Sequence, residues 1–92
     1  MPRVVITAQI EDPVKFEEGF RSHGELFRKQ TVNNPITFSI LEGNQVACCF
    51  EPEDLDTYLD ILNSSETAEA MAIDGVKRES VQVYVLDREF QV

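Results

Sequence analysis

Hydrophobic and polar residues alternate along three short segments of the chain, residues 3–10, 36–42 and 79–86, which is the pattern of half-buried β-strands. A fourth segment, residues 45–50, is short and apolar, which suggests a strand that is buried on both faces. Gly43 and Asn44 separate residues 36–42 from residues 45–50, and a Gly-Asn pair between two strands is typical of a two-residue hairpin turn. The pattern therefore predicts four strands, with the middle two joined as a hairpin.

A helical repeat of apolar residues lies between the first and second predicted strands. Asp12 and Pro13 combine a preferred N-cap residue with proline at the first helical position, so we predict a helix from there to about Gln30. At about 100° per residue, one sector of about 60° on this helix holds four ring-bearing side chains. They are Phe16, Phe20, His23 and Phe27. We expect this stripe to face the sheet.

A second helical repeat follows the third predicted strand. Asp54 is a suitable N-cap, and apolar residues then recur at helical spacing from Leu55 to Leu62. Residues 63–66, NSSE, have the spacing of a capping box with Asn in the capping position. This spacing predicts that the helix restarts or kinks there. Gly75 is the glycine expected just beyond the last helical turn.

The order β-α-β-β-α-β predicts an α+β protein of the ferredoxin-like class, as one domain spanning residues 1–92. In this topology a four-stranded antiparallel sheet carries both helices on one face. The first and last strands have apolar residues on both sides, including Val5 and Tyr84, whereas a solvated face would be polar. We therefore expect a second copy of the chain to cover the open face. The apolar end of the tail, with Phe90 and Val92, could reach across to that copy.

The length and the net charge of the chain indicate which kinds of molecule it can bind. A chain of 92 residues buries only about 60–65 % of its unfolded surface, so its core is thin and association would enlarge it. The net charge of −9, from 17 acidic and 8 basic residues, repels phosphate backbones and anionic lipid. We therefore expect no nucleic-acid and no membrane partner.

The lack of a targeting signal and the two cysteines together favour a cytoplasmic location. No segment approaches the roughly 18 apolar residues of a membrane span, and the first residues lack the features of a signal peptide. Cys48 and Cys49 are adjacent, so in a strand they point to opposite faces and do not pair with each other. We predict a cytoplasmic protein with reduced thiols.

Two stretches, together with the hairpin between them and the closing strand, carry a resemblance to a known family. They are DPVKFEEGFRSHGELF and FEPEDLDTYLDILNSSETAEAM. The chain resembles the dimeric α+β-barrel superfamily over residues 4–86. It is most similar to the short, uncharacterised bacterial members related to the antibiotic-biosynthesis-monooxygenase-like group.

The resemblance implies a homodimer in which two sheets face each other as a barrel, with a pocket between sheet and helices in each protomer. The superfamily includes oxygenases, haem degraders, isomerases and proteins without a known activity, so the resemblance does not select one reaction. The haem-degrading branch uses an Asn–Trp–His set, and this chain has no tryptophan. We therefore predict no cofactor.

His23 is the candidate catalytic residue, because it lies on the inward stripe between two phenylalanines. It could act as a general base or polar anchor in an apolar pocket, or it could be a core histidine bonded to a neighbour. A glycine at position 19, near the edge of the stripe, either leaves space beside His23 or permits close helix–sheet packing. A single histidine with scattered carboxylates gives little support for a metal site, and none is predicted.

The predicted ligand pocket combines helix residues with a tyrosine of the last strand. Its residues are Phe16, Gly19, Phe20, His23, Phe27, Tyr58, Met71 and Tyr84. Three hypotheses follow. The chain binds a small apolar molecule in this pocket, it is a cofactor-independent enzyme of the monooxygenase-like type, or it is an acidic module that docks a basic partner.

Overall fold

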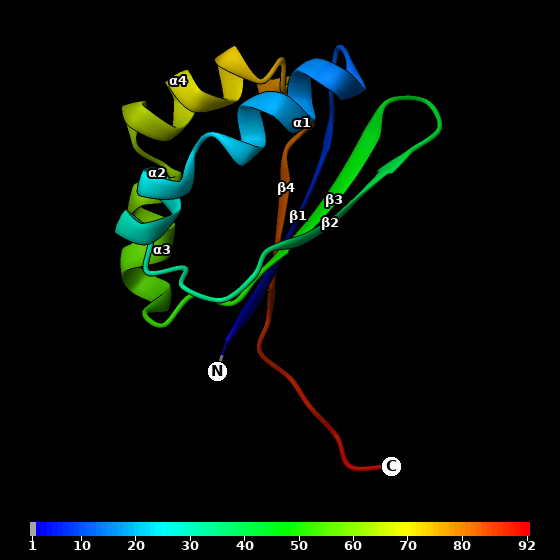
Figure 1. Ribbon diagram of the computed structural model, residues 1–92. Coiled ribbons are helices and arrows are strands. Elements are labelled where there is room, and N and C mark those ends of the chain that lie inside the picture. Colours follow the sequence, from blue (N-terminus) through cyan, green and yellow to red (C-terminus); the bar gives the residue numbers. More distant parts are fainter. Residues whose placement is uncertain (1) are drawn as a thin grey trace.

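The computed structural model of the protein describes residues 2–92, and within them four strands form one antiparallel sheet (Figure 1). The strands are β1 (Arg3–Gln9), β2 (Thr37–Leu41), β3 (Gln45–Phe50) and β4 (Gln82–Leu86). They lie in the order β2-β3-β1-β4, and the helices cover one face of the sheet (Figure 1). The predicted ferredoxin-like fold is confirmed.

The predicted hairpin joins β2 to β3, but its turn has three residues and not two, because Leu41 pairs with Gln45 and residues 42–44 lie between them. Gly43 has a φ of 80° and Asn44 a φ of 57°, so both lie in the left-handed region. Glycine enters this region without strain, and asparagine tolerates it better than most residues. Leu41 and Gln45 face each other across the turn, which sets the register of the two strands.

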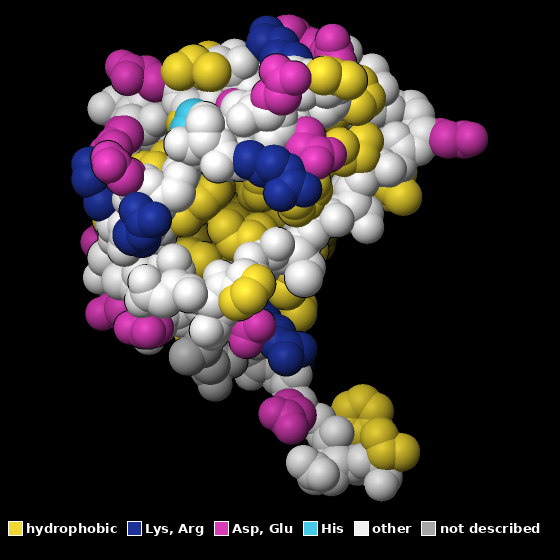
Figure 2. All heavy atoms as spheres, in the orientation of Figure 1, with side chains coloured by type: hydrophobic (Ala, Val, Ile, Leu, Met, Phe, Trp, Pro, Cys, Tyr) yellow, Lys and Arg dark blue, Asp and Glu magenta, His cyan; other side chains and the backbone are white. Residues whose placement is uncertain are grey.

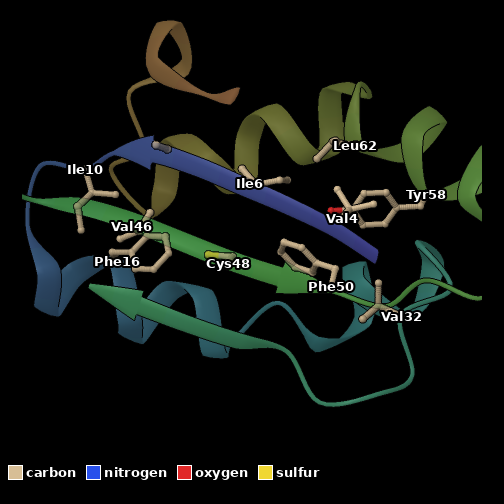
Figure 3. Close-up of a cluster of buried hydrophobic side chains, with 11 residues drawn as sticks. Val4, Ile6, Ile10, Phe16, Val32, Val46, Cys48, Phe50, Tyr58 and Leu62 are labelled. Atoms are coloured by element: carbon tan, nitrogen blue, oxygen red, sulfur yellow. The ribbon is translucent and has the colours of Figure 1, made fainter. Parts of the chain in front are cut away.

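The pairing register assigns alternate residues of each strand to opposite faces of the sheet. Val4 pairs with Val85 and Ile6 with Val83, and Val4 and Ile6 belong to the buried core under the helices. Figure 3 shows this core as a layer of strand side chains that meets ring side chains from α1 and α3. The predicted inward faces of the first and last strands are therefore correct.

The phenylalanine stripe of the first helical segment packs against the sheet as predicted. Phe20 lies at the centre of a group of rings, with centroids 5.1 Å from Phe16, 5.2 Å from Phe27 and 5.2 Å from Phe38. These separations are in the range of favourable aromatic pairs. Phe16 is fully buried, whereas Phe20 and Phe27 are half-buried and lie closer to the surface.

The prediction of one continuous helix to about Gln30 is wrong. Asp12 does cap α1 (Pro13–Arg21), where its side chain accepts a hydrogen bond of 2.8 Å from the Val14 N–H. The helix then ends, and α2 (Gly24–Lys29) begins after a break at His23, which has a φ of −94° and a ψ of 28°. The Ser22 hydroxyl donates to the Gly19 carbonyl at 2.6 Å, a local bond that competes with continued helix.

The second helical segment is also divided, as the sequence predicted, into α3 (Leu55–Leu62) and α4 (Ser65–Ile73). The cap of α4 differs from the predicted one. The Ser64 hydroxyl, not the Asn63 side chain, accepts from the Thr67 N–H at 3.4 Å. Gly75 has a φ of 74°, as expected for the residue that ends the helix.

The last strand begins later than predicted. Residues Arg78–Ser80 form a short 3₁₀ turn, η1, before β4 starts at Gln82. The Ser80 hydroxyl accepts a hydrogen bond of 2.8 Å from the Gln9 N–H and donates one of 2.6 Å to the Lys77 carbonyl. The turn thereby ties the start of β4 to the end of β1.

The face of the sheet that the helices leave bare is apolar at one end and polar at the other. Val5 pairs with Tyr84, and Leu86 follows on the same side of β4, whereas Thr7 pairs with Gln82 further along. Tyr84 is 47 % exposed. Figure 2 shows residues beyond β4 extending from the body, with hydrophobic side chains near the tip, where Phe90 is 83 % exposed.

Within residues 2–92, none of the helices has the length and apolar character needed to cross a membrane.

Candidate functional site

A cavity of about 70 Å³ lies between the helices and the covered face of the sheet. Its walls are almost wholly apolar, and several of their side chains carry the argument below: Phe16, Phe20, Phe27, Phe50, Tyr58 and Met71. One water needs roughly 10–15 Å³ of such space, and an engineered cavity of about 150 Å³ binds benzene. The cavity therefore has room for a molecule of a few heavy atoms, and a larger ligand would require the half-buried Phe20 or Phe27 to move.

A histidine–carboxylate pair forms the polar part of the cavity wall. His23 Nε2 lies 2.9 Å from Asp74 Oδ1, and the side chains are only 16 % and 5 % exposed. His23 stands at the break between α1 and α2, and Asp74 is the C-cap residue of α4. The hydrogen bond therefore joins the α1–α2 break to the C-terminal end of α4, next to the cavity.

The hydrogen bond between the two side chains fixes the orientation of the imidazole. Burial raises the pKa of the Asp74 carboxyl, and the hydrogen bond from His23 acts in the opposite direction. When the carboxyl is ionised, its Oδ1 accepts the proton on Nε2, which leaves the lone pair on Nδ1 free. An imidazole oriented by a carboxylate is a common arrangement for a general base.

Gly19 makes room for the carboxylate. A Cβ built on Gly19 would lie 1.9 Å from Asp74 Oδ1, a distance at which one group must move. Glycine in a helix interior costs about 1 kcal/mol relative to alanine, so this position gives up helix stability to admit the carboxylate. Gly24 is different, because a Cβ there would meet only the Arg28 side chain, at 3.7 Å.

Tyr58 also lines the cavity and carries a polar hydroxyl group, separate from the His23–Asp74 pair. Its side chain is completely buried, and within the described part of the chain its hydroxyl has no protein hydrogen-bond partner. Figure 3 shows this hydroxyl directed from α3 toward the middle of the core cluster. Burial raises the pKa of the phenol, with a smaller contribution from Cys48, so the group keeps its proton.

Two further polar side chains lie in the cavity wall on the helix side. Gln30 is buried, and its Nε2 is 3.5 Å from the Thr67 hydroxyl, a long contact. Thr67 makes its stronger bond to the Ile61 carbonyl. These residues bridge the end of α2 and the start of α4, and their hydrogen bonds are directed mainly within the protein.

The structure brings most of the predicted pocket residues together. Six of the eight, all among the described residues, line the cavity: Phe16, Phe20, His23, Phe27, Tyr58 and Met71. Gly19 lies behind the wall, against Asp74. Tyr84 corrects the prediction, because it shares the bare face of the sheet with Val5 and bonds to the Gln82 side chain there. The sheet separates it from the cavity.

Asp74 is the important residue that the sequence analysis missed. It lies 51 residues from its partner His23, so no local pattern links the two. One feature of the sequence could have pointed to Asp74. The helix dipole disfavours a negative charge at the C-terminus of a helix, and Asp74 directly precedes the predicted terminal glycine. An acidic residue at this position indicates that another interaction compensates for the unfavourable charge.

The cavity lies close to solvent at two places. His23 also lines a groove between α2 and α4, together with Leu26, Glu69 and Ile73, so its imidazole forms part of the partition between cavity and surface. On the side of the edge strand β2, Figure 2 shows a hollow with a hydrophobic floor. Its rim includes Arg21, whose guanidinium lies 5.7 Å from the centre of the Phe38 ring.

Among the described residues, no three His, Cys, Asp or Glu side chains gather closely enough to hold a metal ion. No protein-family model and no curated protein sequence matches the chain.

Solved structures resemble the protein in fold over nearly its whole length. A Bordetella bronchiseptica protein assigned as an antibiotic biosynthesis monooxygenase has a TM-score of 0.72 at 16 % identity, covering 97 % of each chain. SnoaB, a cofactor-independent oxygenase from Streptomyces nogalater solved as a mutant, has a TM-score of 0.70 at 14 % identity, covering 99 % of this chain and 95 % of its own. A Nitrosomonas europaea protein with the same monooxygenase assignment has a TM-score of 0.65 at 11 % identity, covering 98 % of this chain and 100 % of its own. The chain thus has the ferredoxin-like fold of the antibiotic biosynthesis monooxygenase-like proteins.

Proposed function

We propose that the cavity between helices and sheet binds a small, mostly apolar molecule, with His23 as a polar contact. The observation that supports this is an apolar cavity with a hydrogen-bonded His23–Asp74 pair in its wall. A core closed by its own rings would leave no room for a ligand. Here the large side chains of α1, α2 and α4 line the space instead of filling it. Apolar concave sites with few polar groups are typical of small-molecule binding.

A cavity-filling substitution tests this proposal. Ala70 lies on the inner side of α4 and lines the cavity, so Ala70→Leu should fill it and abolish binding of a small cyclic hydrocarbon such as cyclopentane. Ala72→Leu is the matched control, because Ala72 is on the exposed side of the same helix. NMR titration of the core methyl groups reads out both variants. Unchanged spectra of the wild-type protein on addition of cyclopentane would contradict the proposal.

A second candidate function is that of a cofactor-independent oxygenase. The carboxylate-held imidazole of His23 favours it, and so does the likeness in fold to SnoaB. In this case His23 Nδ1 would take a proton from an acidic C–H or O–H of an electron-rich substrate. The resulting carbanion would add dioxygen and take back the proton as a hydroperoxide. If the same carbon still carries a hydrogen, breaking the O–O and C–H bonds would release water and leave a carbonyl group, so the substrate itself supplies both hydrogens and the electrons.

His23→Gln separates the two candidates. A glutamine amide can still donate a hydrogen bond to Asp74 but cannot act as a base. We expect this variant to keep the affinity for an apolar ligand. Oxygen uptake with a panel of small phenols should be lost if the oxygenase proposal holds. Uptake by the variant at the wild-type rate would show that His23 is not the base.

We also propose that a second copy of the chain covers the bare face of the sheet. The exposed apolar end of that face, with Tyr84 and Leu86, and the extended segment carrying Phe90 support this. Tyr84→Glu should shift the protein to the monomer in light-scattering measurements. Val14→Glu is the control, because Val14 is 65 % exposed on α1. A wild-type protein that is monomeric at all concentrations measured would overturn the proposal.

A further inference from the structure

We propose that the Tyr58 hydroxyl donates a hydrogen bond to the ligand, so that the site takes a small neutral molecule with a carbonyl oxygen, of the ketone or aldehyde kind. The inference rests on the proposed binding function and adds the chemical class of the ligand. It also gives Tyr58 a role in binding, as hydrogen-bond donor, that is separate from the role of His23.

The first step is the hydroxyl itself. Tyr58 is 0 % exposed, it lines the cavity, and no described protein group offers its hydroxyl a hydrogen bond. Buried polar groups in folded proteins are nearly always paired, and an unpaired one reduces stability. The ring alone would satisfy the packing, since its nearest aromatic neighbour, Phe50, lies 5.7 Å away at a tilt that a phenylalanine could equally adopt. The oxygen therefore requires a separate explanation.

The second step is the direction of the bond. Burial raises the pKa of the phenol, so Tyr58 remains a neutral O–H and can donate. Unpaired donors are rarer in protein interiors than acceptors with a lone pair to spare, so the proton is the part that most needs a partner. The complementary ligand atom is an acceptor oxygen.

The third step is the charge of the ligand. Among residues 2–92, no lysine or arginine contributes to the cavity wall, so an anionic ligand would be buried without a counter-charge. The acidic group in the wall, Asp74, is already bonded to His23 and would repel an anion further. A neutral carbonyl meets the donor without this penalty.

A two-by-two comparison tests the inference. Cyclopentanone and methylenecyclopentane have the same number of heavy atoms and differ in having C=O or C=CH₂, which makes them a matched pair for the small cavity. We expect Tyr58→Phe to weaken binding of the ketone about tenfold relative to the alkene, measured by NMR titration. Tyr84→Phe removes a hydroxyl from the other face of the sheet and should change neither affinity.

The possible outcomes distinguish this inference from the proposal on which it rests. If neither compound perturbs the core resonances of the wild-type protein, the proposed binding function fails. If both bind and the ketone-to-alkene ratio changes by less than twofold between wild type and Tyr58→Phe, the binding site stands and the role of Tyr58 is overturned. Thermal unfolding of Tyr58→Phe gives a check on folding. We expect a melting temperature no lower than that of the wild type, because the variant removes an unpaired buried group.

Discussion

The two faces of the sheet use the same strands and yet have different surroundings. On the covered face, Val4 and Ile6 are buried beneath helices that enclose a cavity with a few polar groups in its wall. On the bare face, Val5 is half-buried by its neighbours alone, and Tyr84 is 47 % exposed. The difference arises because both helical crossovers lie on the same side. The chain itself therefore covers one face of the sheet and leaves the apolar end of the other face exposed.

The comparison also separates the two kinds of chemistry that the chain carries. On the covered side, the hydrogen-bonded His23 and Asp74 and the buried Tyr58 all line the cavity. Among the described residues, the bare face carries no such histidine–carboxylate pair, and we have proposed that a second copy of the chain covers it. A change on the covered face should therefore alter stability and ligand binding, whereas a change on the bare face should alter association.

Removing one aromatic ring from each face of the sheet should give the largest difference in the free energy of unfolding. Phe16→Ala removes a fully buried ring and should lower the free energy of unfolding by about 3–5 kcal/mol. Tyr84→Ala, on the bare face, should lower it by less than about 1 kcal/mol in the dissociated protomer. Urea unfolding at low protein concentration measures both. Equal losses would mean that the two faces are buried alike within one chain.

Alkylation of the adjacent cysteines should distinguish the faces at neighbouring positions. Cys48 lies on the covered face, where burial raises its pKa to about 12, so its thiol keeps its proton at pH 8 and reacts slowly. Cys49 lies on the bare face and is half-buried. We expect iodoacetamide to modify Cys49 at least about a hundredfold faster, as followed by mass spectrometry of the peptide. If a second copy covers the bare face, this rate should fall as the protein concentration rises.

A methyl group at position 19 should disturb the polar end of the cavity. Glycine-to-alanine changes inside helices usually stabilise, but Gly19→Ala places a Cβ 1.9 Å from Asp74 Oδ1. We expect a loss of about 1–3 kcal/mol in the free energy of unfolding and a shift of the His23 ring signals in NMR spectra. Gly24→Ala, which has no close contact, serves as the control and should leave both nearly unchanged. A stabilised Gly19→Ala would mean that the carboxylate moves without cost.

Acid titration should give the smallest effect. The folded state raises the Asp74 pKa above the value of about 3.9 expected for the unfolded chain. The folded state therefore holds the proton to higher pH, so the contribution of Asp74 to stability is greatest below about pH 4 and is lost as the pH rises through the raised pKa.

Asp74→Asn removes this titration. The free energy of unfolding of the wild type should fall relative to that of Asp74→Asn as the pH increases above about 4, as measured by urea unfolding over a pH series. Asp56→Asn, at an exposed position of α3, controls for the loss of one negative charge. A constant difference between wild type and Asp74→Asn across the series would show that the pKa of Asp74 is not raised.

Patterns of short range determined the fold. Hydrophobic patterning identified the strands, Gly43 and Asn44 placed the hairpin, and Asp12 and Asp54 marked the two helix starts that the structure confirms. Each of these features depends on interactions between residues a few positions apart, such as the 2.8 Å bond from the Val14 N–H to Asp12. For this reason the sequence was sufficient to predict the ferredoxin-like architecture.

Tertiary structure alone decided how the polar groups are placed. The break at His23 has no proline to announce it, and a helical projection assumes that the helix continues. Asp74 is 51 residues from His23 in the chain, and the packing of α4 against the α1–α2 junction brings the two together. The hydroxyl of Tyr58 has no hydrogen-bond partner among the described residues, because the side chains that pack around it are apolar. The sequence by itself determined which elements form and which side chains share a face. Only the folded chain determined which of those side chains meet, because contacts between distant segments depend on packing that no local repeat records.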